Sequence, residues 1–345
     1  GIFQWRKMIY QAGTHGFSVA AKTDSVANCI VSMQIYMRSP CRLLAIAIFY
    51  ESQHSIFLIK KLIMCFALVA VQQHPHYPFI LAANRDEFFE RPATPLGVWP
   101  THPAIVGGID QRSQGSWLAL NQDTYKFALV TNVRQGPPQL GERSRGLLVS
   151  EFVMSSAQAL DDLTQLAATQ TQYAGFNLLA GYLPDQIYYL TNQYSNDAIL
   201  SNQISNQISK KTLNQLLNQL LKQGFYGLSN ASLNTPWPKV KRGLFKFKQL
   251  VTNSQAGQQA QLVDKLLQLL ADRTPAKLVD LPDTGIGLEK ELWLSPIFIA
   301  PDRLNYGTRC STLILMDINK QVFCYERSYY ADHRSSDIKY VLHSA

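Results

Sequence analysis

One cysteine in this sequence could act as a nucleophile that carries its own base. Cys65 directly follows Met64, the only methionine that precedes regularly patterned sequence. If translation starts at Met64, an aminopeptidase removes that methionine, because the next side chain is small, and Cys65 becomes the first residue. Its free α-amine has a pKa of about 8 and can accept the proton of the thiol beside it. The pattern therefore predicts a cysteine that attacks a carbonyl carbon.

Attack on a carbonyl also needs groups that stabilise the thiolate and the oxyanion. Side chains of suitable type stand at the ends of expected strands: Arg85, Asp86, Asn132, Asn177 and Arg309. Structural roles remain open for the same residues. Arg85 and Asp86 could form an ion pair with each other, and the two asparagines could be turn residues. Cys65 itself could be a small buried side chain without reactivity.

The remaining cysteines and histidines form no disulfide or metal pattern. The five cysteines are odd in number and widely spaced, without a CxxC pair: Cys29, Cys41, Cys65, Cys310 and Cys324. His74 and His76 would share a face on a strand and could bind a metal or haem, but Pro75 between them favours a loop. No phosphate-binding or dinucleotide motif is present. We therefore expect no required cofactor.

The elements that must position these residues are hairpins and helices in separate runs. Short apolar segments predict strands over 66–71, 79–83, 117–120, 127–131, 176–180, 187–191, 311–317 and 321–325, with a turn at 74–78. Apolar residues at helical spacing predict helices over 144–169, 196–223, 235–253 and 257–271. No regular alternation of strand and helix appears. The predicted class is therefore α+β with antiparallel pairing.

The third of these helices carries a cluster of basic residues. Thr235 is expected as its N-cap, with Pro236 at the first helical position. The basic residues are Lys239, Lys241, Arg242, Lys246 and Lys248. Such a run could bind an anion, but it is more often a solvated helix face, and we interpret it in that way.

Composition excludes several classes of protein. The chain of 345 residues is 46% hydrophobic, enough for a large folded core. Its net charge is +8, but residues 1–63 hold seven basic and two acidic residues, so the rest is nearly balanced and we expect no nucleic-acid partner. The apolar runs 43–50 and 62–71 are too short to span a bilayer, and no cleavage site of a signal peptide follows Lys60-Lys61. We expect a cytoplasmic protein without a transmembrane segment.

Several blocks of sequence, in order, resemble one family. The block Ala83-Asn84-Arg85-Asp86-Glu87-Phe88 with Met64-Cys65 upstream is similar to the NRDE family, whose eukaryotic member is the transport and Golgi organisation protein 2. Further matching blocks are Gly115–Leu118, Leu129–Asn132, Gly175–Leu179, Tyr226–Trp237, Tyr306–Arg309 and Glu326–Ser328. The resemblance runs from Met64 to about Tyr330. We expect 64–345 to be one domain of this family, and residues 1–63 to be a poorly ordered, non-native upstream extension.

The resemblance implies a fold, a site and two functions. Family members look like N-terminal-nucleophile hydrolases with an αββα sandwich of two antiparallel sheets flanked by helices. The implied site is Cys65 as nucleophile, Asp86 orienting its amine, Arg85 and Arg309 holding the thiolate or a substrate carboxylate, and Asn132 and Asn177 lining the oxyanion region. The implied activity is hydrolysis of a small acyl amide or ester. The alternative is a non-catalytic carrier of haem or an acyl lipid, linked to Golgi organisation and secretion.

Overall fold

The computed structural model of the chain describes residues 8–10, 17–19, 64–134, 141–193, 220–301, 305–332 and 334–342. The chain divides into two compact units, Gly1–Lys61 and Leu62–Ala345. In the first unit, strand β1 (Met8–Tyr10) pairs antiparallel with β2 (Phe17–Val19). The rest of residues 1–63 lies outside the described residues, so the expectation that this segment is a non-native extension stays a prediction.

The described part of the second unit contains two antiparallel sheets of six strands each. The first sheet has the order β11 (Gly224–Leu228), β3 (Met64–Val71), β4 (Phe79–Phe88), β12 (Tyr306–Met316), β13 (Val322–Tyr329), β14 (Ser335–Leu342). The second has the order β10 (Gln186–Thr191), β9 (Phe176–Tyr182), β8 (Lys126–Asn132), β7 (Leu118–Asn121), β6 (His102–Asp110), β5 (Ala93–Trp99). Each strand therefore pairs with antiparallel neighbours, as predicted.

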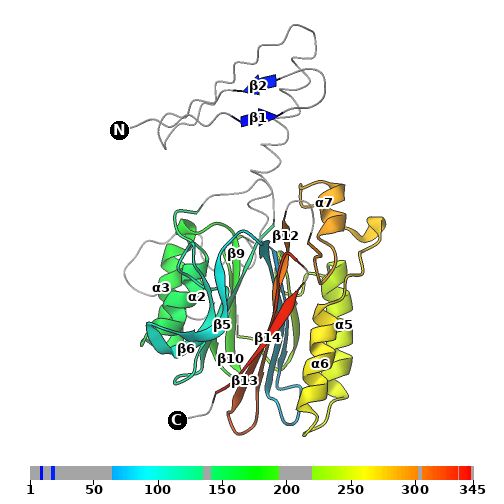
Figure 1. Cartoon of the computed structure of the whole chain (residues 1–345). Coiled ribbons are helices and arrows are strands. Elements are labelled where there is room, and N and C mark those ends of the chain that lie inside the picture. Colours follow the sequence, from blue (N-terminus) through cyan, green and yellow to red (C-terminus); the bar gives the residue numbers. More distant parts are fainter. Residues whose placement is uncertain are drawn as a thin grey trace, which may run out of the picture. The chain divides into compact units, whose positions relative to one another are not determined.

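Helices cover the outer face of each sheet, as Figure 1 shows. The second sheet is covered by α2 (Gly146–Met154) and α3 (Ala159–Thr169), and the first by α5 (Pro238–Thr252) and α6 (Gln259–Leu270). Short helices add α7 (Leu288–Trp293), η1 (Gln170–Gln172) and η2 (Leu278–Asp280). One apolar cluster fills the space between the sheets, and one lies under each helix pair. The αββα sandwich is confirmed.

Strand β3 shows why the sequence of a central strand has no alternation. Phe66 and Leu68 point to the α5–α6 layer, whereas Ala67 and Val69 point to the second sheet. Both faces are buried, so the strand reads as a continuous apolar run. By the same alternation, Cys65 faces the space between the sheets.

Two predicted helices differ from the observed ones. The segment predicted as one helix over 144–169 is two helices, because Ser155 is extended with ψ of 137° after α2. Its hydroxyl donates a hydrogen bond of 2.8 Å to Asp162 and accepts one of 3.1 Å from the Ala157 N–H. Helix α5 begins at Pro238 rather than Pro236, because a residue before proline avoids the helical region and Trp237 has ψ of 149°.

Two further strand and helix expectations are corrected. Most of the helix predicted over 196–223 lies outside the described residues, but Leu220 at its end forms an isolated antiparallel bridge with Tyr188 and is not helical. The chain closes with three strands and not two, because Ser335–Leu342 pairs with β13 at the sheet edge. On this edge strand the exposed residues are Ser335, Asp337 and Lys339 and only Leu342 is buried, so the strand lacks the continuous apolar run of a central strand.

The turn between β3 and β4 contains a buried histidine that makes stability depend on pH. His74 is 5% exposed, and its Nδ1 accepts hydrogen bonds from the His76 and Tyr77 N–H groups. Burial lowers its pKa. Since the folded state disfavours the charged imidazole, stability is fully present above the ordinary value of about 6.5 and is lost as the pH falls below it.

We expect His74→Asn to flatten this acid dependence, because the asparagine oxygen can still accept from the turn N–H groups but does not titrate. The measurement is the difference in Tm between pH 7.5 and pH 5. His102→Asn is the control, since His102 is exposed on β6. A Tm difference in His74→Asn as large as that of the unmodified protein would contradict this assignment.

No helix in the described part of the chain has the length and apolar character that a membrane crossing requires.

Candidate active site

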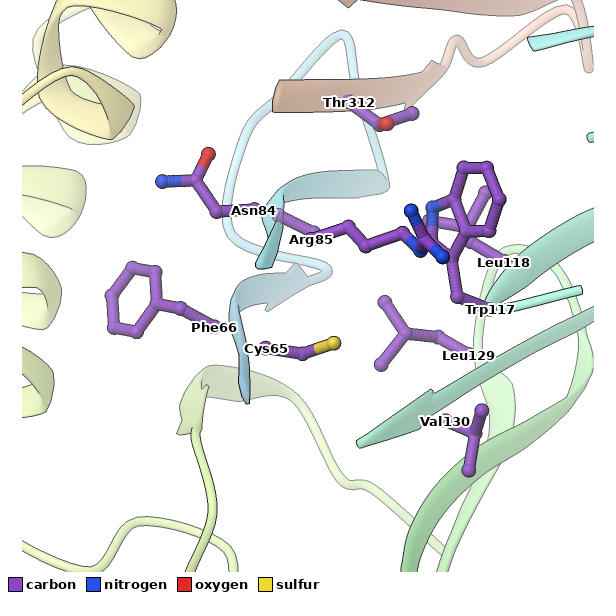
Figure 2. A pocket seen from close by; sticks show the side chains of 10 residues that line it. Cys65, Phe66, Asn84, Arg85, Trp117, Leu118, Leu129, Val130 and Thr312 are labelled. Carbon is purple, nitrogen blue, oxygen red and sulfur yellow. The ribbon is translucent and has the colours of Figure 1, made fainter. Parts of the chain in front are cut away.

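Cys65 lies at the start of β3, directly opposite Arg85 on β4. Facing residues of paired strands share a face, so the thiol and the guanidinium both enter the space between the sheets. Figure 2 shows the sulfur pointing toward Leu129 of the second sheet, while Phe66 and Asn84 point away from it. The thiol is 8% exposed. Burial and the charge of Asp86 raise its pKa to about 12, against the opposing effect of Arg85, so the thiol is protonated at neutral pH.

A narrow pocket surrounds the thiol. It has space for little more than a water molecule. Its walls come from both sheets: Cys65, Phe66, Ala83, Asn84, Arg85, Trp117, Leu118, Leu129, Val130 and Thr312. Of the six predicted site residues, Cys65 and Arg85 line this pocket together.

The Arg85 guanidinium is held in a buried charge network and not by Asp86. Its Nη2 lies 3.6 Å from Glu87 and 3.4 Å from Asp110, and both carboxylates also pair with Arg91. The ring of Trp117 lies 4.4 Å from the guanidinium carbon. The alternative that Arg85 and Asp86 pair with each other is therefore wrong. The network fixes the guanidinium beside the thiol.

Trp117 can lie over Arg85 because Gly108, against its ring, has no side chain. A Cβ atom at Gly108 would lie 2.0 Å from the Trp117 ring. We expect Gly108→Ala to displace the indole and to cost about 1–3 kcal/mol of stability, as overpacking of a core does. Thermal melts and near-ultraviolet circular dichroism measure both effects. Gly97→Ala on β5 is the control, because its Cβ would meet nothing nearer than 3.4 Å. Equal melts for the two variants would refute the packing argument.

Asp86 projects to the opposite face of the same strand, toward the helices. It is fully buried, its Oδ1 accepts a hydrogen bond of 2.6 Å from the Thr308 hydroxyl, and its Oδ2 has no partner among the described residues. Burial raises its pKa to about 6, against the opposing charge of Lys239. Asp86 thus lies next to Cys65 along the sheet, with one carboxylate oxygen unused.

Lys239 departs from the solvated helix face that we predicted for α5. Its side chain is 2% exposed and donates a hydrogen bond of 3.3 Å to the Leu294 carbonyl oxygen. Burial lowers its pKa to about 8, and the charge of Asp86 opposes that shift. Lys241, Lys246 and Lys248 are exposed, as expected. Lys239 is the basic residue of this helix that turns inward, because α5 packs its first turn against the first sheet.

Asn177 lies on β9 with every hydrogen of its amide in use. Its Nδ2 donates to the Thr131 hydroxyl at 3.1 Å and to the Ala231 carbonyl at 2.9 Å. Its Oδ1 accepts from the Tyr189 hydroxyl at 2.9 Å. In this arrangement the side chain ties β9 to β8 and to the segment after β11, and no N–H is left for an oxyanion.

Asn132 ends β8 opposite Phe176 and is 8% exposed. Its backbone carbonyl accepts a hydrogen bond of 2.9 Å from Nδ2 of Asn230, which in turn follows Ser229. The Ser229 hydroxyl donates at 3.2 Å to the Cys65 carbonyl oxygen. Asn132 is therefore connected to Cys65 through two neighbouring residues, and neither it nor Asn177 is a turn residue, since both lie in strands.

Arg309 is the extra residue of a β-bulge in β12, between Thr308 and Cys310. Its Nη1 donates to three carbonyl oxygens, those of Phe88, Phe89 and Arg91, at 2.9, 3.3 and 3.0 Å. Burial, followed by the charge of Arg85, lowers its pKa. The side chain holds the chain reversal after β4, and the structure does not bring it into the pocket wall.

Sequence reasoning missed several residues of the site region. Trp117 was visible inside the Gly115–Leu118 block but had no role assigned. Asp110 stands 25 residues after Arg85, Arg91 follows the end of β4, and Arg145 lies just before α2. No local pattern marks these three, because their relation to Cys65 arises from strand pairing and the packing of one sheet on the other.

The fold and the site together define a class of protein. It is an αββα protein with a cysteine at the start of a central strand, facing the space between two antiparallel sheets. Residues 64–331 match the family model described as Transport and Golgi organisation 2. The chain belongs to this family, over the span that the sequence blocks predicted.

Relatives in animals agree with the family assignment. The Transport and Golgi organization 2 homolog of Mus musculus is 32% identical over 264 residues, which cover 73% of this chain and 87% of the relative. The homolog of Bos taurus is 33% identical over 267 residues, with the same coverage. Transport and Golgi organization protein 2 of Drosophila melanogaster is 25% identical over 278 residues, covering 76% of this chain and 92% of that protein.

Proposed function

We propose that this protein is a cysteine-dependent N-terminal-nucleophile hydrolase of a small acyl amide or ester. The observation that carries the proposal is the position of Cys65: it starts a central strand, faces the space between the sheets and stands opposite the fixed guanidinium of Arg85. Cys324, by contrast, is a buried thiol whose raised pKa has burial as its cause, without charged neighbours.

The proposed reaction begins after removal of Met64 and everything before it. The Cys65 α-amine takes the thiol proton, and the sulfur forms a bond to the substrate carbonyl carbon. The C–N or C–O bond then breaks, and the leaving group takes the proton from the amine. Water next attacks the thioester, with the amine again as base, and releases the carboxylic acid and the thiol. The unused oxygen of Asp86 would orient the amine.

The raised pKa of Cys65 explains why the upstream chain must be absent in this proposal. With the peptide bond to Met64 intact, no base is adjacent to the thiol, and its pKa of about 12 keeps the thiolate scarce. A free amine supplies the missing base within the same residue.

A carrier function for haem or an acyl lipid remains the alternative prediction. The pocket at Cys65 has space for little more than water, so haem, an acyl lipid or the acyl substrate of the hydrolase would each require the surrounding elements to part, most of all for the larger cargo. The cytoplasmic location also stays a prediction. A carrier does not need the Cys65 thiol, whereas the hydrolase does. The reactivity of this thiol therefore distinguishes the two functions.

The test compares the chain that begins at Met64 with the 345-residue chain. N-terminal sequencing and intact mass identify the first residue, and an electrophilic acyl probe, mapped by mass spectrometry, reports whether Cys65 is labelled. We expect labelling and hydrolysis of an acyl-amide panel when Cys65 is the first residue, and neither in the longer chain. Hydrolysis by a chain in which Met64 remains attached would exclude the mechanism.

A further inference from the structure

A second guanidinium, that of Arg145, interacts electrostatically with Cys65 and has no counter-ion among the described residues. Arg145 directly precedes α2, and its Nη1 donates a hydrogen bond of 3.0 Å to the carbonyl oxygen of Gly175, just before β9. Within the described ranges, no carboxylate forms an ion pair with Arg145. Four of its five N–H groups have no hydrogen bond to a described residue.

Close backbone packing fixes the position of Arg145. The Ser116 N–H donates a hydrogen bond of 3.0 Å to the Gly146 carbonyl oxygen. A Cβ atom on Gly115 would lie 2.4 Å from the backbone of Gly146, so no larger residue fits there. This contact joins the start of α2 to the segment that carries Trp117. Arg145 is therefore held on the side of the pocket formed by the second sheet.

The electrostatic surroundings of Arg145 connect it with the thiol. Burial lowers its pKa to about 10, and the charges that act on it next are those of Cys65 and Glu87, which oppose the shift, and of Arg91, which adds to it. A cation near other cations is costly in a buried site unless an anion accompanies it.

The charges of the site do not balance. Four guanidinium groups gather near this end of the pocket against three carboxylates: Arg85, Arg91, Arg145 and Arg309 against Glu87, Asp110 and Glu326. Arg85 and Arg91 share two of the carboxylates. The third, Glu326, accepts hydrogen bonds from Leu96, Thr312 and Ser328. On the opposite face, Asp86 and Lys239 offset each other.

Of the two arginines that have no carboxylate partner among the described residues, Arg309 is fixed by the three carbonyl oxygens that its Nη1 binds, although its buried Nε has no partner there. Arg145 retains unused donors, is only partly buried, and so can meet a ligand. We propose that Arg145 binds a carboxylate group of the substrate. The substrates of the site are then acyl amides or esters that carry a carboxylate in addition to the bond that is cleaved. The planar guanidinium matches a carboxylate in two hydrogen bonds. This inference rests on the proposed function and assigns its substrate class.

Binding tests the inference without requiring hydrolysis. The chain that begins at Met64 is used, since Leu62–Ala345 forms a compact unit by itself. Calorimetry compares phenylacetate with phenylacetamide, which has nearly the same shape but no charge. We expect preference for phenylacetate, a loss of about 10- to 100-fold in its affinity in Arg145→Gln, and little change for phenylacetamide. Equal affinities, an absence of binding, or preference that survives Arg145→Gln would overturn the inference.

Matched variants separate recognition from folding. Arg143→Gln changes a neighbouring arginine that pairs with Glu151 at the surface, and it should bind phenylacetate normally. Arg145→Lys keeps the charge but not the paired hydrogen bonds. Its affinity for phenylacetate should lie between that of the native protein and that of Arg145→Gln. If Arg145→Gln fails to fold, a Lys variant with native affinity overturns the inference.

Hydrolysis of benzoylglycine and benzoylglycinamide then measures kcat/KM for an anionic and a neutral amide. We expect the anionic substrate to be preferred at least about 10-fold, with the preference lost in Arg145→Gln through KM. Failure to cleave either amide, combined with Arg145-dependent binding of phenylacetate, would reject the proposed function and keep the anion site. Cleavage of both at equal rates would reject the substrate class alone.

Discussion

Replacing Cys65 by alanine is expected to lower hydrolysis of any substrate of this site by at least about 10³-fold, while the protein folds and melts nearly as before. The sulfur is the atom that would form the covalent intermediate. The one hydroxyl in the pocket wall, that of Thr312, donates its hydrogen to Glu326 at 3.1 Å and does not replace the thiol. The side chain lies at the end of its strand, at the pocket and not in the centre of the apolar cluster between the sheets. The stability cost should therefore be small.

Cys324→Ala provides the matched control. Cys324 is 1% exposed within the cluster between the sheets, and its thiol has a pKa raised to about 12 by burial, so it resembles Cys65 in burial and protonation. It has no charged neighbours that the reaction could use. Hydrolysis should persist in this variant and disappear in Cys65→Ala. Comparable rates in the two variants would show that the reaction, if present, occurs elsewhere.

Replacing Glu291 by alanine is expected to cause the largest loss of stability among the substitutions considered. Glu291 on α7 is 3% exposed, and its Oε2 pairs with Nη2 of Arg134 at 2.7 Å. Arg134 is itself buried, and its guanidinium lies 4.7 Å from the ring of Trp237. Breaking a buried ion pair costs about 3–5 kcal/mol, and here the Arg134 guanidinium loses its carboxylate partner Glu291. Tm should fall by roughly 6–10 °C.

The pair matters because it connects distant segments. Arg134 follows β8, whereas Glu291 also accepts a hydrogen bond of 3.1 Å from the Thr284 N–H. Its loss therefore frees α7 and the segment before it from the end of the second sheet. Glu289→Ala, on an exposed position of the same helix, is the control and should change Tm little. A similar small shift in Glu291→Ala would mean that the ion pair contributes no net stability.

The sequence predicted the residues at the centre of the candidate site better than those at its edge. Cys65 and Arg85 were found from residue type and spacing, and they line one pocket because a hairpin of known register must place them opposite each other. Arg309 and Asn177 were chosen in the same way, from residue type at strand ends, but hydrogen bonds of their side chains run to the backbone of adjacent segments. Residue type could not distinguish these cases, because an arginine binds a carbonyl oxygen as readily as a ligand.

The secondary structure followed the same division. Most strands buried on both faces and most helices with an apolar stripe were predicted, because a buried element has a continuous run or a regular spacing of apolar residues in its sequence. The break at Ser155, the glycine-containing strand β6 and the edge strands β5, β11 and β14 were missed, because polar hydrogen bonds, glycines and edge pairing weaken such a signal.

By itself, the amino-acid sequence determined the family, the α+β class with antiparallel pairing and the cysteine that could react, because these depend on local pattern and on chain order. The tertiary structure alone decided which charges meet. It placed Arg85 with Asp110, turned Lys239 inward toward Asp86, and gave Arg145 no carboxylate partner among the described residues. The physical reason is that charge pairing depends on distance in space, and two packed sheets bring together residues that no sequence spacing relates.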